Sequence, residues 1–210
     1  MQHKPLRRFR PTQWLFYAIC RVKYGLVWIS LLYSGKSKDA VNAGGRFVME
    51  VINISDSLRL RNYDGHYELF LPAYQDPYVY QNSEGIFDDS RKPDLDYVKG
   101  MCDWLSTHGN MYYIEAKEGD RFIPIGDVTV KPENPPITIW REEYRNKGIG
   151  KAVMRRVIQI LKERGAEKIT GSTVYKWNLP SRRMHEAIGF HVVRETDKEW
   201  VMELDLSAIS

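Results

Sequence analysis

Two glycines, one residue apart and set among cations, stand at the head of an apolar-periodic run in the stretch "RNKGIGKAVMRRVIQILKERG" (145–165). The apolar residues recur at helical spacing, so the run predicts an amphipathic helix packed on a core. Glycine at a helix start lets backbone N–H groups approach a ligand, and the helix N-terminus adds unpaired donors and partial positive charge. The stretch therefore predicts a phosphate site, strengthened by Arg145, Lys147 and Lys151. A simple turn before a solvated basic helix explains one glycine but not two flanked by charge.

Two common phosphate-binding motifs do not fit this turn. A P-loop requires G-x-x-x-x-G-K-[ST], and the sequence has no such spacing. A dinucleotide fingerprint requires a third small residue where this chain has Val153, and an acidic residue that closes the next strand. Glu167 instead precedes the strand "KITGSTV". Neither nucleotide motif explains the two glycines.

Residues 49–210 predict a mixed α+β fold, because a hairpin-rich first half is followed by strand–helix–strand–helix. Residues 110–130 read as two strands joined by a tight turn at 118–120. Residues 94–109 predict a helix with Asp94 as N-cap. Further elements are expected at these places: a strand over 57–63, a helix over 64–77 interrupted by Pro72, a loop over 79–94, strands over 137–140 and 168–174, a helix over 178–189, and strands over 190–196 and 200–206.

The charge of the 210 residues is divided unevenly. Residues 1–48 hold nine Lys or Arg and one acidic residue, whereas residues 49–210 hold 22 basic and 26 acidic ones, so a net charge of +4 conceals an acidic body. This body lacks the basic surface of a nucleic-acid-binding protein, and we expect no nucleic-acid partner. Cys20 and Cys102 give neither a disulfide framework nor a metal spacing, which predicts a cytoplasmic protein without a bound metal.

Residues 1–48 form a separate basic and apolar segment of unknown role. The run "WLFYAICRVKYGLVWISLLY" (14–33) approaches the length of a membrane span, but Arg21 and Lys23 would cost roughly 2.5–3.5 kcal/mol each near a bilayer centre. A signal peptide is also disfavoured, since no small-residue cleavage site follows closely. Three interpretations stay open: a membrane-surface or docking helix, a helix packed on the main domain, or sequence outside a mature chain that starts at Met49. Membrane contact is expected only through this segment.

Two motifs together resemble the GNAT superfamily of N-acyltransferases. R-x-x-G-x-G (Arg145, Gly148, Gly150) after a short strand is similar to that family's acetyl-coenzyme A signature. "NLPSRRMHEAIGF" (178–190) is similar to its second element. Either motif alone is weak, whereas the pair at this separation is fairly specific. The resemblance covers about residues 57–206, with the elements in the expected order.

The resemblance implies a GNAT-like fold in which a mostly antiparallel central sheet contains a splayed parallel pair of strands, here 137–140 and 168–174. Acetyl-CoA would be the co-substrate, with its pyrophosphate on the glycine turn. A backbone N–H at Ile139 or Trp140 would donate to the acetyl oxygen. The residues implied to hold acetyl-CoA are Ile139, Trp140, Arg145, Asn146, Lys147, Gly148, Ile149, Gly150, Lys151, Asn178 and Ser181.

Three residues are candidates for proton transfer. His185 stands where the family often has a tyrosine that protonates the leaving thiolate, and histidine can donate a proton near neutral pH. The alternative is that His185 only packs. Glu142, before the turn, and Asp127, on the neighbouring strand, are nominated as general base. Each is also explained as a solvated acid or by a structural hydrogen bond.

We therefore expect an enzyme that transfers an acetyl group from acetyl-CoA to a primary amine of a small molecule or a protein N-terminus. The amine would attack directly in a ternary complex. The missing tyrosine and the unproven base keep a second hypothesis open, a non-catalytic acyl-CoA-binding regulatory module. The acceptor and the oligomeric state do not follow from the sequence.

Overall fold

The computed structural model describes residues 49–209, so the interpretations of residues 1–48 lie outside the described part of the chain. The predicted α+β class is confirmed. The elements follow one another in this order: β1 (Val51–Ser55), β2 (Leu58–Asn62), η1 (Tyr67–Phe70), α2 (Leu71–Tyr74), α3 (Pro77–Glu84), η2 (Asp89–Arg91), α4 (Leu95–His108), β3 (Asn110–Glu118), β4 (Arg121–Val130), β5 (Ile137–Ile139), η3 (Glu142–Tyr144), α5 (Ile149–Glu163), β6 (Lys168–Tyr175), α6 (Leu179–Glu186), β7 (His191–Glu195) and β8 (Glu199–Asp205).

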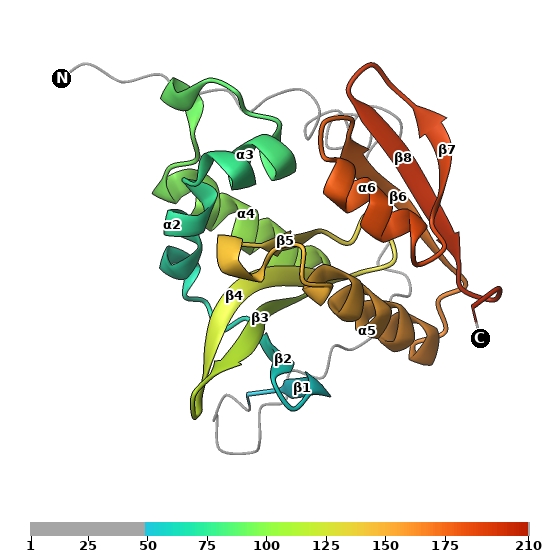
Figure 1. The fold of residues 1–210 in the computed structure, drawn as a ribbon, viewed down its shortest axis with the longest axis horizontal. Coiled ribbons are helices and arrows are strands. Elements are labelled where there is room, and N and C mark those ends of the chain that lie inside the picture. The colour runs from blue at the N-terminus through green and yellow to red at the C-terminus, as the bar shows by residue number, and fades with distance from the viewer. Residues whose placement is uncertain (1–48, 210) are drawn as a thin grey trace, which may run out of the picture. The chain divides into compact units, whose positions relative to one another are not determined.

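The strands form two antiparallel sheets (Figure 1). One has the order β1-β2-β3-β4-β5, and the other has the order β6-β8-β7. They meet just before β5, where Glu133 and Thr170 form a parallel bridge and the Asn134 N–H donates to Thr170 O at 2.7 Å. Beyond this point β5 and β6 belong to different sheets, so the two strands diverge as the family resemblance implies.

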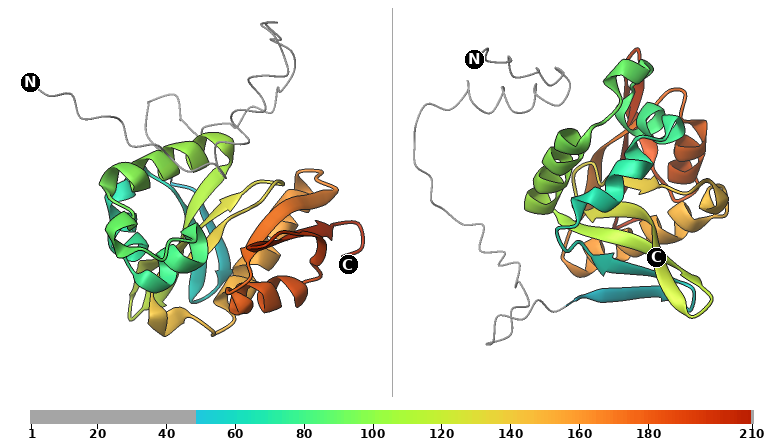
Figure 2. Two further views of the ribbon diagram at one scale, coloured as in Figure 1. Left: turned by 90° about the horizontal axis from the view of Figure 1, so that it is seen from above. Right: turned by 90° about the vertical axis from the view of Figure 1, so that its left-hand side faces the viewer.

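Alternation along β3 divides the core into two clusters. Tyr112 and Ile114 pack on the side of α5, whereas Met111 and Tyr113 pack on the side of α2 and α4. The right-hand view of Figure 2 shows α4 and α5 on opposite sides of the larger sheet. α5 contributes its predicted apolar residues Val153, Val157, Ile160 and Leu161 to the first cluster, and Met154 and Ile158 are buried with them.

The first helical region differs from the sequence prediction. The helix expected over 64–77 is broken into η1 and α2, and residues 77–84 form helix α3, although a loop was expected from residue 79. Proline stands near the start of both α2 and α3, where its missing N–H is tolerated. The Asp76 side chain caps α3 by accepting the Tyr78 N–H at 3.0 Å. Asp76-Pro77, expected at the end of one helix, is therefore the start of the next.

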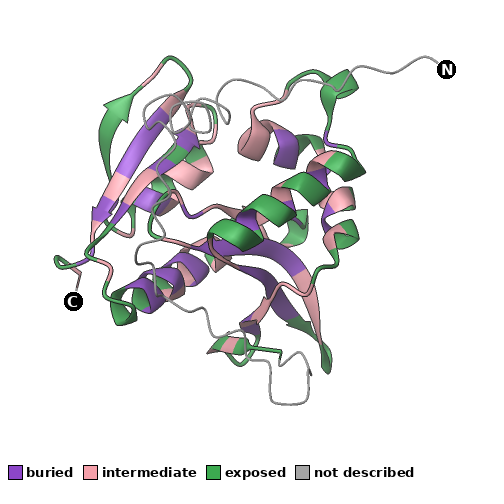
Figure 3. Cartoon of the chain, turned by 180° about the vertical axis from the view of Figure 1, so that it is seen from behind, coloured by how far each residue is buried: buried purple, intermediate pink, exposed green. Residues whose placement is uncertain are grey.

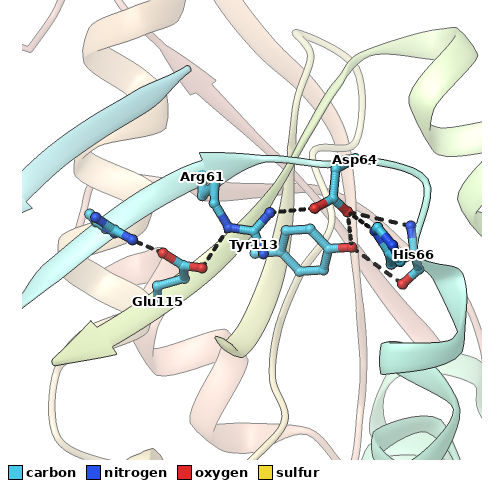
Figure 4. Close-up of polar contacts among 6 residues, drawn as sticks. Arg61, Asp64, His66, Tyr113 and Glu115 are labelled. Carbon is cyan, nitrogen blue, oxygen red and sulfur yellow. Dashed lines mark hydrogen bonds and ion pairs between the residues drawn. The ribbon is translucent and has the colours of Figure 1, made fainter. Parts of the chain in front are cut away.

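A polar network joins β2, β3 and the loop that follows β2 (Figure 4). Glu115 is 3% exposed and accepts hydrogen bonds from Nε of Arg59 at 2.7 Å and Nε of Arg61 at 2.6 Å. Arg61 also pairs with Asp64 at 2.7 Å, and Asp64 accepts the Tyr113 hydroxyl at 2.9 Å. The buried charge of Glu115 is thus compensated by two guanidinium groups, as burial of a carboxylate requires.

The solvent exposure of the residues follows the arrangement of the sheets and helices (Figure 3). The outer strand β7 is exposed along its whole length, and α4 buries only one side. None of the helices between residues 49 and 209 has both the length and the apolar character needed to cross a membrane.

Candidate functional site

Two residues in left-handed conformation shape the turn between β5 and α5. Asn146 has φ 57°, and Gly148, the N-cap of α5, has φ 78°. Glycine adopts this conformation without strain, and asparagine tolerates it better than most residues. The first intrahelical bond runs from the Ala152 N–H to Gly148 O at 3.0 Å. The N–H groups of residues 149–151 are therefore left without a helical acceptor.

The two glycines face open space. A Cβ added to Gly148 or Gly150 would meet no atom within 4 Å. Gly148 is required by its positive φ, but Gly150 has an ordinary helical conformation, so neither backbone nor packing demands glycine there. At the N-terminus of α5, the two glycines leave the backbone open to close approach by a ligand. Lys147 and Lys151 flank this opening, and neither forms an ion pair within residues 49–209.

Arg145 is bound within the protein. Its Nη2 lies 2.6 Å from Asp76 Oδ2 and also donates to Trp140 O, while its Nε donates to Ile139 O at 3.2 Å. The guanidinium lies over the Tyr78 ring, and the side chain is 10% exposed. Arg145 therefore fixes the glycine turn to the end of β5 and the start of α3. These contacts explain the motif arginine as a positioning residue rather than a direct phosphate ligand.

Strand register distinguishes the two backbone donors expected on β5. The Trp140 N–H donates to Ile125 O at 2.8 Å, and Thr138 pairs with Asp127. Hydrogen-bonding residues alternate along an antiparallel strand, so the N–H of Ile139 points away from β4, toward the side on which β6 diverges. Ile139 is therefore the candidate donor to a ligand, whereas the Trp140 N–H belongs to the sheet.

The second motif joins α6 to α3. Asn178 Oδ1 accepts the Ser181 N–H at 3.2 Å and so caps α6, and Asn178 Nδ2 donates to Asn82 O at 3.3 Å. An asparagine N-cap satisfies a donor that the helix leaves free. These bonds give Asn178 a structural role that accounts for its place in the motif without a ligand.

His185 is a packing residue in this structure. It is 5% exposed, and its Nδ1 lies 2.8 Å from Ser181 O. Because a carbonyl oxygen only accepts, Nδ1 carries the proton. The ring stands edge-on to Phe190, with ring centroids 4.9 Å apart, and burial lowers the pKa of His185. A buried neutral imidazole is a poor proton donor, so the structure favours packing over the expected acid role.

The two nominated bases lie in opposite environments. Glu142 is exposed on η3, whereas Asp127 is 1% exposed on β4. Asp127 Oδ1 accepts Trp140 Nε1–H at 2.6 Å and the Tyr74 hydroxyl at 3.3 Å, while Oδ2 is buried with no hydrogen-bond partner among the described residues. Burial raises the pKa of Asp127 to about 7, despite these hydrogen bonds. A carboxylate poised near neutrality suits a general base.

Sequence reasoning missed Glu84 and the contact of Tyr74 with Asp127. Tyr74 is buried beside Asp127, and Glu84 is the last residue of α3, close enough for its charge to act on Asp127. Recognising Asp76-Pro77 as a helix start would have placed Glu84 on a helix end. Between residues 49 and 209, no group of three or more His, Cys, Asp or Glu residues could hold a metal ion.

Solved structures share this fold at low sequence identity. A domain from Methanocaldococcus jannaschii DSM 2661 has 19% identity and a TM-score of 0.60, covering 75% of this chain and 99% of that one. A GNAT-family acetyltransferase from Bacillus anthracis has 16% identity and a TM-score of 0.58, covering 75% and 99%. The Microcin C7 self immunity acetyltransferase MccE, in complex with acetyl-CoA and AMP, has 14% identity and a TM-score of 0.55, covering 72% and 94%. Among curated protein sequences, none matches the chain.

The family model described as "Acetyltransferase (GNAT) family" matches residues 66–190, more than half of the 210 residues. The matched range contains the glycine turn, Asp127 and the motif on α6. It confirms the resemblance, together with the family-level predictions of an acetyltransferase that uses acetyl-CoA as co-substrate. With the diverging strands and the open glycine turn at the head of α5, this match shows that the chain belongs to the acetyltransferase (GNAT) family.

Proposed function

We propose that this protein transfers the acetyl group of acetyl-CoA to a primary amine of a small molecule or a protein N-terminus, by direct attack in a ternary complex. The observation that carries the proposal is the open glycine turn at the N-terminus of α5, where no atom lies within 4 Å of a Cβ added to Gly148 or Gly150. The N–H groups of residues 149–151 hold the pyrophosphate, and Lys147 and Lys151 add positive charge. Asn146 and Gly148 shape the turn, and Ser181 lies on the neighbouring helix α6.

The chemistry follows from the groups near the divergence of β5 and β6. The Ile139 N–H donates to the thioester oxygen, where negative charge develops during attack. The amine nitrogen bonds to the acetyl carbon, the carbon–sulfur bond breaks, and the proton lost by the amine passes to Asp127. The departing CoA thiolate takes its proton from solvent, since a thiol has an ordinary pKa of about 8.5. The products are the N-acetylated amine and CoA.

A charged side chain at Gly150 tests the pyrophosphate site. Glutamate is favourable in the first turn of a helix, so Gly150→Glu keeps the thermal midpoint while its side chain fills the open space with negative charge. We expect at least a ~100-fold loss of acetyl-CoA affinity in calorimetry, or about 2.7 kcal/mol. Gly100→Glu on α4, another helical glycine with no atom within 4 Å, is the matched control and leaves binding unchanged. Unaltered binding by Gly150→Glu would contradict the site.

A non-catalytic acyl-CoA-binding module is the second candidate function. The observation that favours it is the burial of both His185 and Asp127, which leaves no exposed acid–base pair beside Ile139. A thiol-release assay across a panel of amines distinguishes the two functions. Thermal stabilisation by acetyl-CoA without CoA release from any amine supports the module, whereas release with at least one amine supports the enzyme. The cytoplasmic location stays a prediction.

A further inference from the structure

A pocket of about 390 Å³ lies between the edge strand β1 and helix α5, and six residues line it: Asn53, Ile54, Ala152, Arg155, Arg156 and Gln159. Its volume is within the range of small-molecule sites, roughly 300–1,000 Å³. Asn53, Arg155 and Gln159 are exposed residues, so the pocket is accessible from solvent. The lining shares no residue with the glycine turn, with Asp127 or with the motif on α6. The proposed function therefore leaves this pocket unexplained.

Four of the lining residues form a single stripe along α5. From Ala152 to Gln159 they occupy positions i, i+3, i+4 and i+7, which lie on one face of a helix. Ala152 and Ile54 both pack against the core cluster on the α5 side of the sheet. The pocket therefore combines an apolar base with polar side chains around it, as small-molecule sites do.

The two arginines of the pocket have few acceptors within the protein. Arg155 forms no ion pair within residues 49–209. Arg156 Nη1 lies 3.5 Å from Glu163 Oε1, at the long limit of a hydrogen bond, and the Glu163 side chain is 58% exposed. Arg156 Nε is buried and has no hydrogen-bond partner among the described residues. Because an exposed ion pair contributes little and a buried N–H without an acceptor is unfavourable, both guanidinium groups are poorly compensated.

Other packed arginines of this domain differ from Arg156. Arg59 and Arg61 donate their Nε–H groups to Glu115 at 2.7 and 2.6 Å. Residues 49–210 hold more acidic than basic residues, so a generally basic surface does not account for two neighbouring arginines without a close carboxylate. An oxyanion between them would supply the acceptors that the protein does not.

The pocket lies at the opposite edge of the larger sheet from the candidate thioester donor. The strand order β1-β2-β3-β4-β5 places β1 four strands away from Ile139 on β5 (Figure 1). At the usual spacing between strands, this separation is about 19 Å. Arg155 and Arg156 also lie beyond the first turn of α5, whose free N–H groups form the proposed pyrophosphate site. A ligand in this pocket therefore binds apart from the reacting acetyl group.

We propose that the pocket between β1 and α5 binds a small anion, a carboxylate or a phosphate monoester, whose oxygen atoms lie between Arg155 and Arg156. Guanidinium groups match both oxyanions through paired N–H donors. The side-chain amides of Asn53 and Gln159 provide further donors. The apolar base of the pocket contacts the carbon part of the ligand. Binding at this site does not depend on the proposed function, since it requires no acetyl transfer.

The test titrates the full chain with phenyl phosphate, with benzoate, and with inorganic phosphate as a probe that lacks a carbon part. CoA is present throughout to occupy the glycine turn. We expect saturable binding with a Kd of about 1 mM or lower for at least one organic anion, and weaker binding of inorganic phosphate. The tighter of the two organic anions identifies the ligand as a phosphate monoester or a carboxylate. In NMR spectra, the side-chain amide signals of Asn53 and Gln159 move during the same titration.

Two substitutions each remove one guanidinium group. Arg155→Gln and Arg156→Gln are each expected to weaken binding about 10-fold, the worth of one charge-assisted hydrogen bond. Arg156→Lys, which keeps the charge without the paired donors, is expected to retain part of the affinity. Arg121→Gln, at an exposed arginine of β4 that does not line the pocket, is the matched control and leaves binding unchanged. Thermal midpoints close to that of wild type show that the variants fold.

Three outcomes would overturn the inference. The first is the absence of saturable binding up to about 10 mM of each anion, and the second is undiminished affinity in both glutamine variants. The third comes from comparing CoA with dephospho-CoA, which lacks the 3′-phosphate. If the glutamine variants bind CoA more weakly but dephospho-CoA equally well, the pocket holds the cofactor's own phosphate and is not a separate site. Unchanged affinity for both cofactors supports a separate site.

Discussion

Replacing Asp127 by asparagine is expected to make the protein more stable and less active at the same time. The substitution keeps Oδ1 as acceptor for Trp140 Nε1–H and removes the charge of a side chain that is 1% exposed. Oδ2, which has no partner among the described residues, becomes an amide nitrogen of nearly the same size. The change therefore removes the ionisation with little change in volume, while the buried N–H groups of the new amide, which have no acceptor among the described residues, offset part of the gain.

The magnitude follows from linkage. The pKa of Asp127 rises from 3.8 to about 7 on folding, so the folded state binds the proton more tightly than the unfolded state. The free energy of unfolding then falls as pH rises through this window and stays low above it. A difference of about three pH units corresponds to a penalty of about 4 kcal/mol at pH 8. Asp127→Asn removes it, and about 2–4 kcal/mol raises Tm by roughly 5–15 °C in a chain of this size.

Urea unfolding and thermal melts at pH 5 and pH 8 measure the first effect, and the pH profile of kcat/KM measures the second. Wild-type kcat/KM rises through an ionisation near pH 7, because the base must be unprotonated, and Asp127→Asn loses about 100-fold or more at pH 8. Exposed Asp120→Asn in the β3–β4 turn is the control. A variant that is less stable at pH 8, or whose stability difference does not grow between pH 5 and pH 8, would refute the reasoning.

Two further substitutions test whether Arg145 and His185 act through their contacts within the protein. Arg145→Ala breaks the ion pair with Asp76 and removes the side-chain donor to the carbonyls of Ile139 and Trp140. Urea unfolding should therefore show a loss of about 2–4 kcal/mol, and the KM for acetyl-CoA should rise. Exposed Arg155→Ala changes stability by less than about 0.5 kcal/mol, and an equally small effect of Arg145→Ala would contradict its anchoring role. His185→Phe keeps kcat/KM within about 10-fold and leaves the ionisation near pH 7 in place, because the buried ring does not donate the proton. A loss of about 100-fold with an altered pH profile would restore the acid role.

Local signals predicted the second half of the fold well. The hairpin turn, the strand before the glycine turn and the apolar period of α5 each lie within one short stretch, and the structure contains all three. The region before α4 was harder, because prolines and caps cut it into pieces too short to show a period. α3 is mostly polar and begins with Asp76-Pro77, so turn chemistry and helix chemistry looked alike.

Motif positions predicted a candidate site but did not reveal the contacts that each side chain makes within the folded chain. Arg145 is bound by Asp76, which lies 69 residues earlier, and Asn178 reaches Asn82 across 96 residues. Such contacts exist only in the folded chain. The glycines were different, since their function depends on a missing side chain and on local backbone conformation. This is why the glycine turn could be predicted from sequence, whereas the contacts of Arg145 and Asn178 could not.

The contrast between Glu115 and Asp127 shows that sequence alone does not reveal which acid is paired with a cation. Both are acids within the β3–β4 hairpin, and their surroundings in sequence do not separate them. Glu115 pairs directly with Arg59 on β2, whereas Asp127 pairs with Thr138 on β5. The order of the strands therefore places Arg59 and Arg61 next to Glu115, whereas Asp127 forms no ion pair within residues 49–209. A buried carboxylate without a cationic partner among the described residues is unfavourable to folding, and under the proposed function this cost is offset because Asp127 can accept the proton of the attacking amine.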